Sequence, residues 1–164
     1  MVKHLQSNPD DLRGWTLLAR SYLSKSRYKD AVSAFAMAYQ LSSGEPNIAV
    51  DYAEALSLLE NSIVTEEAHG LFLEVLENDN SNAKARYYLG MFEAQQGNLL
   101  SALQAWVDLV TLSQKDAPWL PIVKEKIDQA SKELGIRADT IKPTPEVQKI
   151  ALDIQKAYQN AQAK

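Results

Sequence analysis

Small residues recur along this chain at a nearly constant interval, and each is followed by a second short pattern. Ala19 and Ala53 are 34 positions apart, and Gly90 follows Ala53 after 37 positions. Behind each small residue comes an alanine with an aromatic residue four positions later. The three pairs are Ala31 with Phe35, Ala68 with Phe72, and Ala102 with Trp106. A period near 34 residues is typical of stacked helical hairpins, in which the small residue allows two helices to approach and the aromatic ring fills the space beside it.

The first hairpin carries the fullest version of the pattern. Trp15, Leu18, Ala19 and Tyr22 have the spacing W-x2-L-G-x2-Y of the tetratricopeptide repeat (TPR), with Ala19 in place of the glycine. Alanine is also small, so the position keeps what close helix packing requires. Several large and small positions therefore fall at fixed offsets across two helices, which favours a TPR hairpin over an ordinary antiparallel helix pair.

The second and third hairpins each depart from the first at one place. Leu56 and Ala68 are 12 positions apart, whereas the matching interval in the first hairpin is 9, so the loop at residues 60–64 is predicted to hold three extra residues. This insertion accounts for the longer interval of 37 positions. In the third hairpin, Glu93 stands where the repeat has an aromatic residue, and Phe92 is expected to substitute with a shifted rotamer.

The pattern predicts an all-α fold, a right-handed α-solenoid of three TPR hairpins with a capping helix and an amphipathic C-terminal tail helix. The repeats are placed at about residues 9–42, 46–78 and 82–114 and the capping helix at about 118–134, so the TPR domain covers residues 1–135. Residues 136–145 are predicted to be a linker, and residues 146–164 the tail helix. Asn8 or Asp10 is expected to cap the first helix.

The predicted tail helix has one narrow apolar stripe on an otherwise polar surface. The stripe consists of Val147, Ile150, Ile154, Tyr158 and Ala161. Such a helix is not stable alone in water and must dock on another surface. Three arrangements stay open: the helix packs on this protein's own body, it mimics a helical ligand or pairs with a second copy, or it frays.

Composition and motifs argue against several function classes. The net charge is -4, whereas a nucleic-acid binder usually has a basic face. The chain has no cysteine, which excludes disulfides and thiol nucleophiles, and its two histidines, His4 and His69, lack convincing ligand partners. No phosphate-binding loop, G-x-S-x-G or dinucleotide motif occurs. We therefore expect no enzyme activity, no cofactor, no metal site and no nucleic-acid partner.

A peptide-binding surface is expected on the concave side of the solenoid, which the first helix of each hairpin lines. The repeat frame places four outward positions on each of these helices. The predicted peptide-binding residues are Arg13, Thr16, Arg20 and Leu23 on the first hairpin, Asn47, Val50, Glu54 and Ser57 on the second, and Lys84, Tyr87, Met91 and Gln95 on the third. Apolar residues and charges of both signs together suit an amphipathic helix or an extended peptide.

Five segments occur together in a particular order. They are residues 8–15, 26–31 and 51–56, the long turn before residues 65–68, and residues 102–106. As an ordered set they resemble the periplasmic domain of bacterial cytochrome c maturation proteins of the CcmI/CycH and NrfG type. The resemblance covers about residues 2–134, and its more distinctive parts are the long second turn and Trp106.

This resemblance implies an accessory chaperone of the haem lyase. Such a protein holds unfolded apocytochrome c, largely through its C-terminal helix, and presents it to the haem-lyase membrane subunits. It also implies a periplasmic location and a membrane anchor that is absent from this chain. Two alternatives stay open: a generic TPR adaptor or chaperone for another peptide client, and a self-associating structural module with a tail-mediated dimer.

Overall fold

The computed structural model describes the backbone of residues 2–162 and the side chains of residues 3–160. Within this range the secondary structure consists of nine α-helices and one short 3-10 helix. The chain divides into two compact units, Met1–Asn80 and Ser81–Lys164. Each unit has its own hydrophobic core, and the two are considered in turn.

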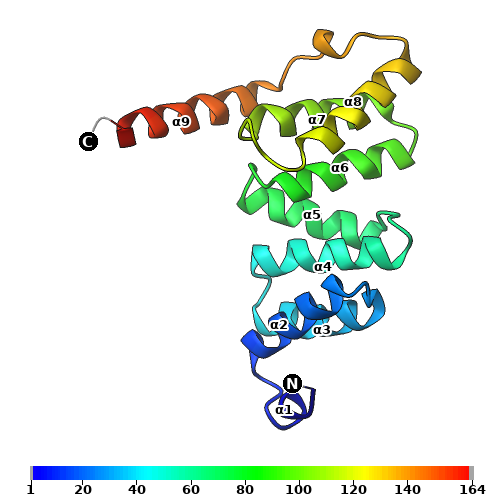
Figure 1. Ribbon diagram of the computed structural model, residues 1–164, viewed down its shortest axis with the longest axis vertical. Coiled ribbons are helices and arrows are strands. Elements are labelled where there is room, and N and C mark those ends of the chain that lie inside the picture. Colours follow the sequence, from blue (N-terminus) through cyan, green and yellow to red (C-terminus); the bar gives the residue numbers. More distant parts are fainter. Residues whose placement is uncertain (1, 163–164) are drawn as a thin grey trace. The chain divides into compact units, whose positions relative to one another are not determined.

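The first unit is built from five helices that follow one another along the chain (Figure 1). They are α1 (Val2–Ser7), α2 (Leu12–Ser24), α3 (Tyr28–Leu41), α4 (Pro46–Leu59) and α5 (Glu66–Asn78). Within this unit α2 packs on α3, α3 on α4 and α4 on α5. The pairs α2–α3 and α4–α5 are the two hairpins that the repeat spacing predicts.

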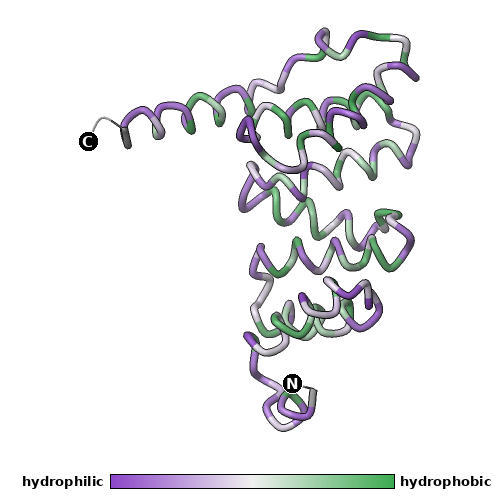
Figure 2. The backbone as a smooth tube through the Cα atoms, viewed as in Figure 1, coloured by the Kyte–Doolittle hydropathy of each residue, from purple (hydrophilic) through white to green (hydrophobic). Residues whose placement is uncertain are grey.

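The small and aromatic repeat positions form the centre of the first unit, as predicted. Ala19 and Phe35 are fully buried in the first hairpin, and Ala53 and Phe72 are fully buried in the second. Figure 2 shows hydrophobic and hydrophilic stretches alternating along these helices, as expected for helices with one buried face. Burial of apolar surface is therefore what pairs the helices in this order.

The start of the first unit differs from the expectation. Residues 2–7 form the short helix α1, and its Leu5 side chain is fully buried next to Gly14 of α2. The cap of α2 is Asp11, whose Oδ1 accepts a hydrogen bond from the Gly14 backbone N at 2.8 Å. The prediction of Asn8 or Asp10 as the cap is therefore wrong, because the turn after α1 brings the chain into α2 one residue later.

The predicted three-residue insertion forms a tight turn between α4 and α5. Asn61 and Ser62 both adopt left-handed backbone conformations, with φ values of 55° and 67°. After this turn Val64 is buried, and Thr65 caps α5 by accepting a hydrogen bond from the Ala68 backbone N at 3.2 Å. The extra residues therefore reverse the chain while the Ala68 position keeps its place in the hairpin.

The second unit contains the third hairpin and the C-terminal helices. Its elements are α6 (Ala83–Gln95), α7 (Leu99–Leu112), α8 (Leu120–Leu134), the 3-10 helix η1 (Ala138–Thr140) and α9 (Pro145–Gln162). Helix α7 packs against α6, α8 and α9. The core contains Leu103, Trp106, Val123 and Ile127, so α8 covers the α6–α7 hairpin with its apolar stripe.

Close packing in the third hairpin depends on Gly90. A Cβ atom at this position would collide with the indole of Trp106, which lies directly against the glycine backbone. The Trp106 Nε1 donates a hydrogen bond to the Tyr87 carbonyl at 3.2 Å. Phe92 is buried, as expected of the residue that replaces the missing aromatic, while the Glu93 carboxylate accepts a hydrogen bond from Asn98.

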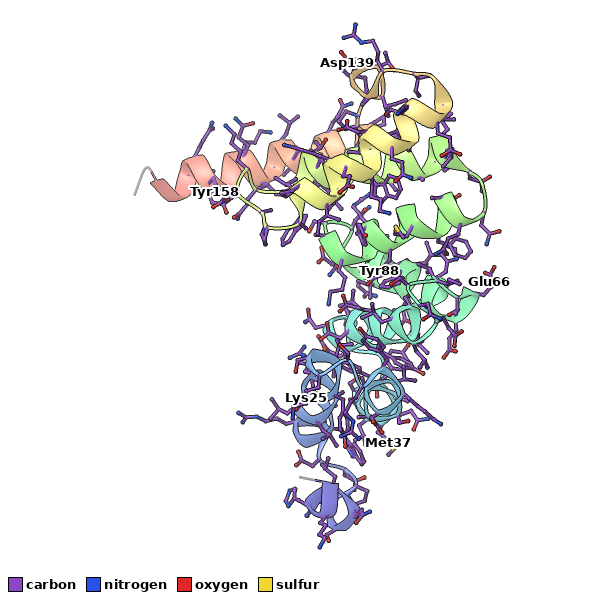
Figure 3. The ribbon with its side chains drawn as sticks, turned by 45° about the vertical axis from the view of Figure 1, so that its right-hand side comes forward. Lys25, Met37, Glu66, Tyr88, Asp139 and Tyr158 are labelled. Carbon is purple, nitrogen blue, oxygen red and sulfur yellow. The ribbon has the colours of Figure 1, made fainter. Side chains whose placement is uncertain are left out.

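The tail helix buries apolar surface on the second unit in its first turns and makes a polar contact with it nearer its C-terminal end. Val147 is fully buried, whereas Ile154 and Tyr158 are 38% and 55% exposed. Figure 3 labels Tyr158 on α9. Its hydroxyl accepts a hydrogen bond from Gln114 Nε2 at 2.9 Å. Of the arrangements left open by the sequence, packing on the protein's own body therefore applies to the start of α9. The Ala161 side chain lies outside the described residues.

Candidate functional site

Helices α2 and α4 enclose a groove within the first unit. It has a volume of about 630 Å³ and combines apolar, basic and amide side chains. The residues that line it are Leu12, Arg13, Thr16, Leu17, Arg20, Glu45, Asn47 and Ile48. Leu17 is 49% exposed, so the groove offers an apolar contact to a ligand as well as charged groups.

Most polar groups in this α2–α4 groove already have partners. Arg20 donates to Asp51 Oδ2 through Nε and Nη2, each at 2.8 Å. Glu45 caps α4 by accepting hydrogen bonds from the backbone N atoms of Asn47 and Ile48. Arg13 is exposed and has no hydrogen bond or ion pair within the described part of the chain. The Arg13 guanidinium can therefore donate hydrogen bonds to a ligand carboxylate without breaking an existing ion pair.

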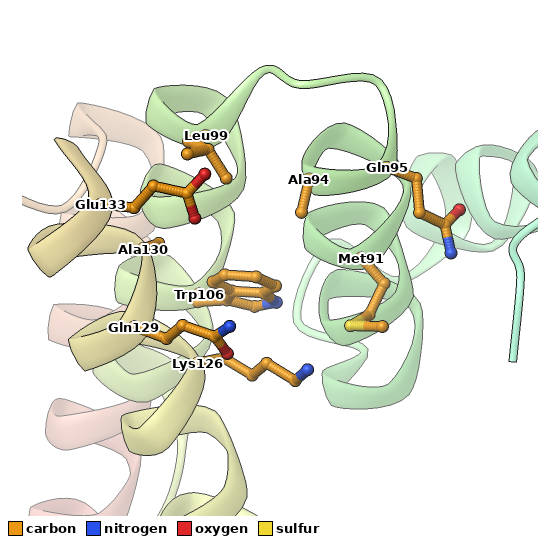
Figure 4. Close-up of a pocket in the computed structure, with 9 residues that line it drawn as sticks. All are labelled: Met91, Ala94, Gln95, Leu99, Trp106, Lys126, Gln129, Ala130 and Glu133. Atoms are coloured by element: carbon orange, nitrogen blue, oxygen red, sulfur yellow. The ribbon is translucent and has the colours of Figure 1, made fainter.

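A second groove lies within the second unit, between α6 and α8, with α7 as its floor (Figure 4). Its volume is about 280 Å³. The residues that line it are Met91, Ala94, Gln95, Leu99, Trp106, Lys126, Gln129, Ala130 and Glu133. Trp106 on the floor of the groove packs against Gly90 and donates a hydrogen bond to the Tyr87 carbonyl.

The two grooves contain half of the predicted peptide-binding residues. Arg13, Thr16, Arg20 and Asn47 line the α2–α4 groove, and Met91 and Gln95 line the α6–α8 groove. The remaining six predicted residues line neither groove. Leu23 and Tyr87 are partly buried against the cores of their units, and burial raises the pKa of the Tyr87 hydroxyl. Glu54 and Lys84 are half-buried outside the grooves.

Two predicted residues do not face outward. Val50 and Ser57 are both buried, at 6% and 0% exposure, so the prediction of outward side chains is wrong for these positions. The Ser57 hydroxyl donates to the Ala53 carbonyl at 2.9 Å. This local bond satisfies the polar group inside the protein, which explains how a serine is tolerated in a buried position.

The sequence-based list misses the contribution of α8. Lys126, Gln129 and Glu133 fall at helical spacing on the side of α8 next to its buried stripe, and they form one wall of the α6–α8 groove. A recognisable signal was available, because a helix that caps a stack of hairpins also continues the series of first helices.

The described residues contain neither a cluster of potential metal ligands nor a helix of membrane-spanning character. Within residues 3–160, no three His, Asp or Glu side chains cluster as metal ligands would. His4 lies 3.4 Å from Asp11 in an exposed position at the start of the chain. No helix in the described range is long and apolar enough to cross a membrane.

Comparison with known proteins shows which family the chain belongs to. A family model described as the cytochrome c-type biogenesis protein H TPR domain matches residues 1–119. The chain belongs to this family. This TPR domain is 37% identical over 124 residues to the cytochrome c-type biogenesis protein CycH of Rhizobium meliloti, and 33% identical over 125 residues to CycH of Bradyrhizobium diazoefficiens. These alignments cover 76% of the chain but only 32% and 34% of the relatives. The chain therefore spans about a third of the length of the curated relatives it matches.

Solved structures confirm the predicted fold class. MamA superposes with a TM-score of 0.69 at 16% identity, covering 96% of this chain and 86% of MamA. The TPR2B domain of yeast Sti1, described as a complex with pHsp70, superposes with a TM-score of 0.64 at 18% identity, covering 74% and 97%. At these identities the similarity establishes the fold alone, which is an all-α fold of TPR hairpins.

Proposed function

We propose that this TPR domain is a protein-binding module of cytochrome c maturation. In this proposal it binds a helical segment of unfolded apocytochrome c, above all the C-terminal helix, and presents it to the haem-lyase membrane subunits. Membership of the cytochrome c-type biogenesis family supports the pathway. The proposed activity is binding without a catalytic step.

The observation that carries the proposal is the make-up of the α6–α8 groove. Met91 on the α6 wall provides an apolar side chain beside the buried Trp106 of the floor, while Lys126 and Glu133 provide charges on the α8 wall. An amphipathic helix offers the complementary surface, with an apolar stripe for the floor and polar residues along its edges. A small, partly polar groove of this kind supports affinity in the micromolar range rather than tighter binding.

The proposed location is the periplasm. Relatives of this chain are cytochrome c-type biogenesis proteins, and the chain covers only part of their length. We infer that a membrane segment outside these residues anchors the full-length protein beside its lyase partners.

Calorimetric titration tests the proposal directly. The domain is titrated with the C-terminal helix peptide of its host's own c-type cytochrome and with a scrambled peptide of equal charge. Met91→Ala removes an apolar contact from the groove. It is expected to weaken binding of the native peptide about five- to thirtyfold, which corresponds to a lost anchor contact of roughly 1–2 kcal/mol. Met37→Ala on α3 is the matched control, because Met37 lines neither groove.

Saturable binding of the native peptide that is weakened by Met91→Ala but not by Met37→Ala would support the proposal. Equal affinity for the native and scrambled peptides, or no binding of either, contradicts the apocytochrome client. Such a result would favour a TPR adaptor for a different peptide.

Self-association through α9 is a second candidate function, because Leu152, Ile154 and Tyr158 are all exposed on this helix. Sedimentation measurements of the wild-type domain and of an Ile154→Glu variant separate the two cases. A concentration-dependent dimer that Ile154→Glu abolishes supports a structural module. A monomer at all concentrations excludes self-association through this helix.

A further inference from the structure

The α6–α8 groove carries opposite charges at its two ends. Lys126 and Glu133 both belong to α8 and are separated by seven positions, which is about 10 Å along a helix. Figure 4 shows both side chains at the groove, with Trp106 in the space between them. Neither charge has an ion pair or hydrogen bond with another described residue. Both are therefore available to a ligand without the loss of an internal contact.

A ligand helix that fits this charge pattern needs particular residue types at four positions. Residues at positions i, i+3, i+4 and i+7 of a helix lie on one face, and the outer two are separated by the same distance as Lys126 and Glu133. An acidic residue at one end and a basic residue at the other can therefore pair with both α8 charges at once. The two intervening apolar residues then lie against Met91, above the buried Trp106.

The helix dipole favours one direction for a client helix whose ends lie beside Lys126 and Glu133, since its effect is confined to the first and last turns. The C-terminal end of a helix is partially negative and the N-terminal end is partially positive. Placing the C-terminal end beside Lys126 and the N-terminal end beside Glu133 makes both interactions favourable. The opposite direction places each end beside a charge of its own sign. A ligand helix is thus favoured antiparallel to α8.

We propose that the α6–α8 groove selects an amphipathic client helix with a basic residue seven positions before an acidic residue, bound antiparallel to α8. The basic residue faces Glu133, and the acidic residue faces Lys126. This inference rests on the proposed function, since it assumes that the groove receives a helical client. It adds the charge order and the direction of that client.

The chain's own α9 does not have this charge order. At the seven-residue spacing it offers Glu146 with Asp153 and Lys149 with Lys156, which are pairs of like charge. Its first turns are also docked against α7. A peptide with the α9 sequence is therefore a suitable negative control for binding to the groove.

The decisive experiment is a charge-reversal cycle measured by calorimetry. The probe is an 18-residue designed helical peptide with Lys at position i, leucines at i+3 and i+4, and Glu at i+7. Lys126→Glu is expected to weaken its binding about three- to tenfold, and a second peptide with Lys in place of that Glu is expected to recover the loss. Lys124→Glu is the matched control, because Lys124 is exposed on α8 outside the groove. Circular dichroism establishes that each variant keeps its helix content.

Direction is measured with a paramagnetic label. The chain has no cysteine, so Lys132→Cys provides a single attachment site one residue from Glu133. We expect the label to broaden the NMR signals of the N-terminal half of the bound peptide. Broadening confined to the C-terminal half would overturn the antiparallel arrangement.

The failure of this inference is distinguishable from the failure of the proposed function. If the designed peptide binds equally to the wild-type domain, Lys126→Glu and Lys124→Glu, the charge order is wrong. The proposed function still stands in that case provided that Met91→Ala weakens binding of the native cytochrome peptide. If neither the designed nor the native peptide binds, both the groove assignment and the charge order are overturned.

Discussion

Thr144 donates two hydrogen bonds to the buried carboxylate of Asp108. The Thr144 backbone N lies 2.8 Å from Oδ1, and its Oγ1 lies 3.0 Å from Oδ2. The same carboxylate accepts a hydrogen bond from Gln104 at 3.1 Å and lies 3.9 Å from the Arg86 guanidinium. This arrangement joins α7 to the residue that precedes α9 through polar contacts.

We predict that Thr144→Val loosens the start of α9. The substitution keeps the shape of the side chain but removes the hydroxyl bond to Asp108 and the weaker bond that Oγ1 accepts from the Val147 backbone N. A hydrogen bond to a charged group contributes about 1.5–3 kcal/mol. Hydrogen exchange of the amides at residues 147–151 should therefore accelerate by at least about tenfold. Thr140→Val, which alters an exposed hydroxyl in η1, should leave these rates unchanged. Unaltered exchange in Thr144→Val would show that apolar packing of Val147 alone holds the helix.

We predict that Gly90→Ala destabilises the second unit, because the new methyl group meets the Trp106 indole. Overpacking of this kind typically costs about 1–3 kcal/mol. Denaturant unfolding followed by tryptophan fluorescence measures the change. Gly70→Ala is the control, since no atom lies within 4 Å of the added Cβ on α5, and it should stabilise the protein by about 0.5–1 kcal/mol. Equal effects of the two substitutions would contradict the tight contact at Gly90.

Stability should fall in alkaline solution through Tyr39. Its hydroxyl donates a hydrogen bond to Glu74 Oε2 at 2.8 Å, and this bond, followed by burial and the Glu74 charge, raises the Tyr39 pKa above 10.0. In the unfolded chain the tyrosine ionises near 10.0, whereas the folded chain keeps the proton to higher pH. The free energy of unfolding therefore decreases as pH rises from about 10 through the folded-state pKa.

Tyr39→Phe should reduce this alkaline loss of stability, because phenylalanine has no hydroxyl whose proton is held more tightly in the folded state than in the unfolded state. Urea unfolding at several pH values between 9 and 11 measures the slope. Tyr28→Phe is the comparison variant, since the Tyr28 hydroxyl has no partner within the described part of the chain. Identical slopes for the wild type and Tyr39→Phe would rule out the Glu74 bond as the cause.

Arg13→Glu should weaken binding of an acidic client peptide to the α2–α4 groove. Arg13 is exposed and unpaired among the described residues, so its reversal removes an attraction without breaking an internal contact. We expect affinity to fall about three- to tenfold at low salt, with a smaller difference at 1 M salt, where exposed charges are screened. Lys25→Glu, at the opposite end of α2, is the control for net charge. The same loss in both variants would point to long-range attraction rather than a groove contact.

Many features of the fold follow from local sequence pattern. The repeat interval predicts the helix pairs α2–α3, α4–α5 and α6–α7, because the spacing of small and aromatic residues indicates which faces of two helices meet. Gly90 with Trp106 and the insertion before Thr65 were predictable for the same reason. The apolar stripe on α8 likewise indicates a helix that covers its neighbour. These features depend on periods of three to four residues that are visible along the chain.

The sequence by itself determined the hairpins and their order, whereas tertiary structure decided which side chains remain available for binding. The repeat frame treats every first helix alike, yet Val50 and Ser57 are buried, while Lys126 and Glu133 form a groove wall on a helix assigned only a capping role. The contact of α9 with α7 also depends on Asp108 and Thr144, which are 36 positions apart. Helical periodicity identifies the face of a helix, but solvent exposure depends on everything that packs against that face, and those neighbours come from distant parts of the chain.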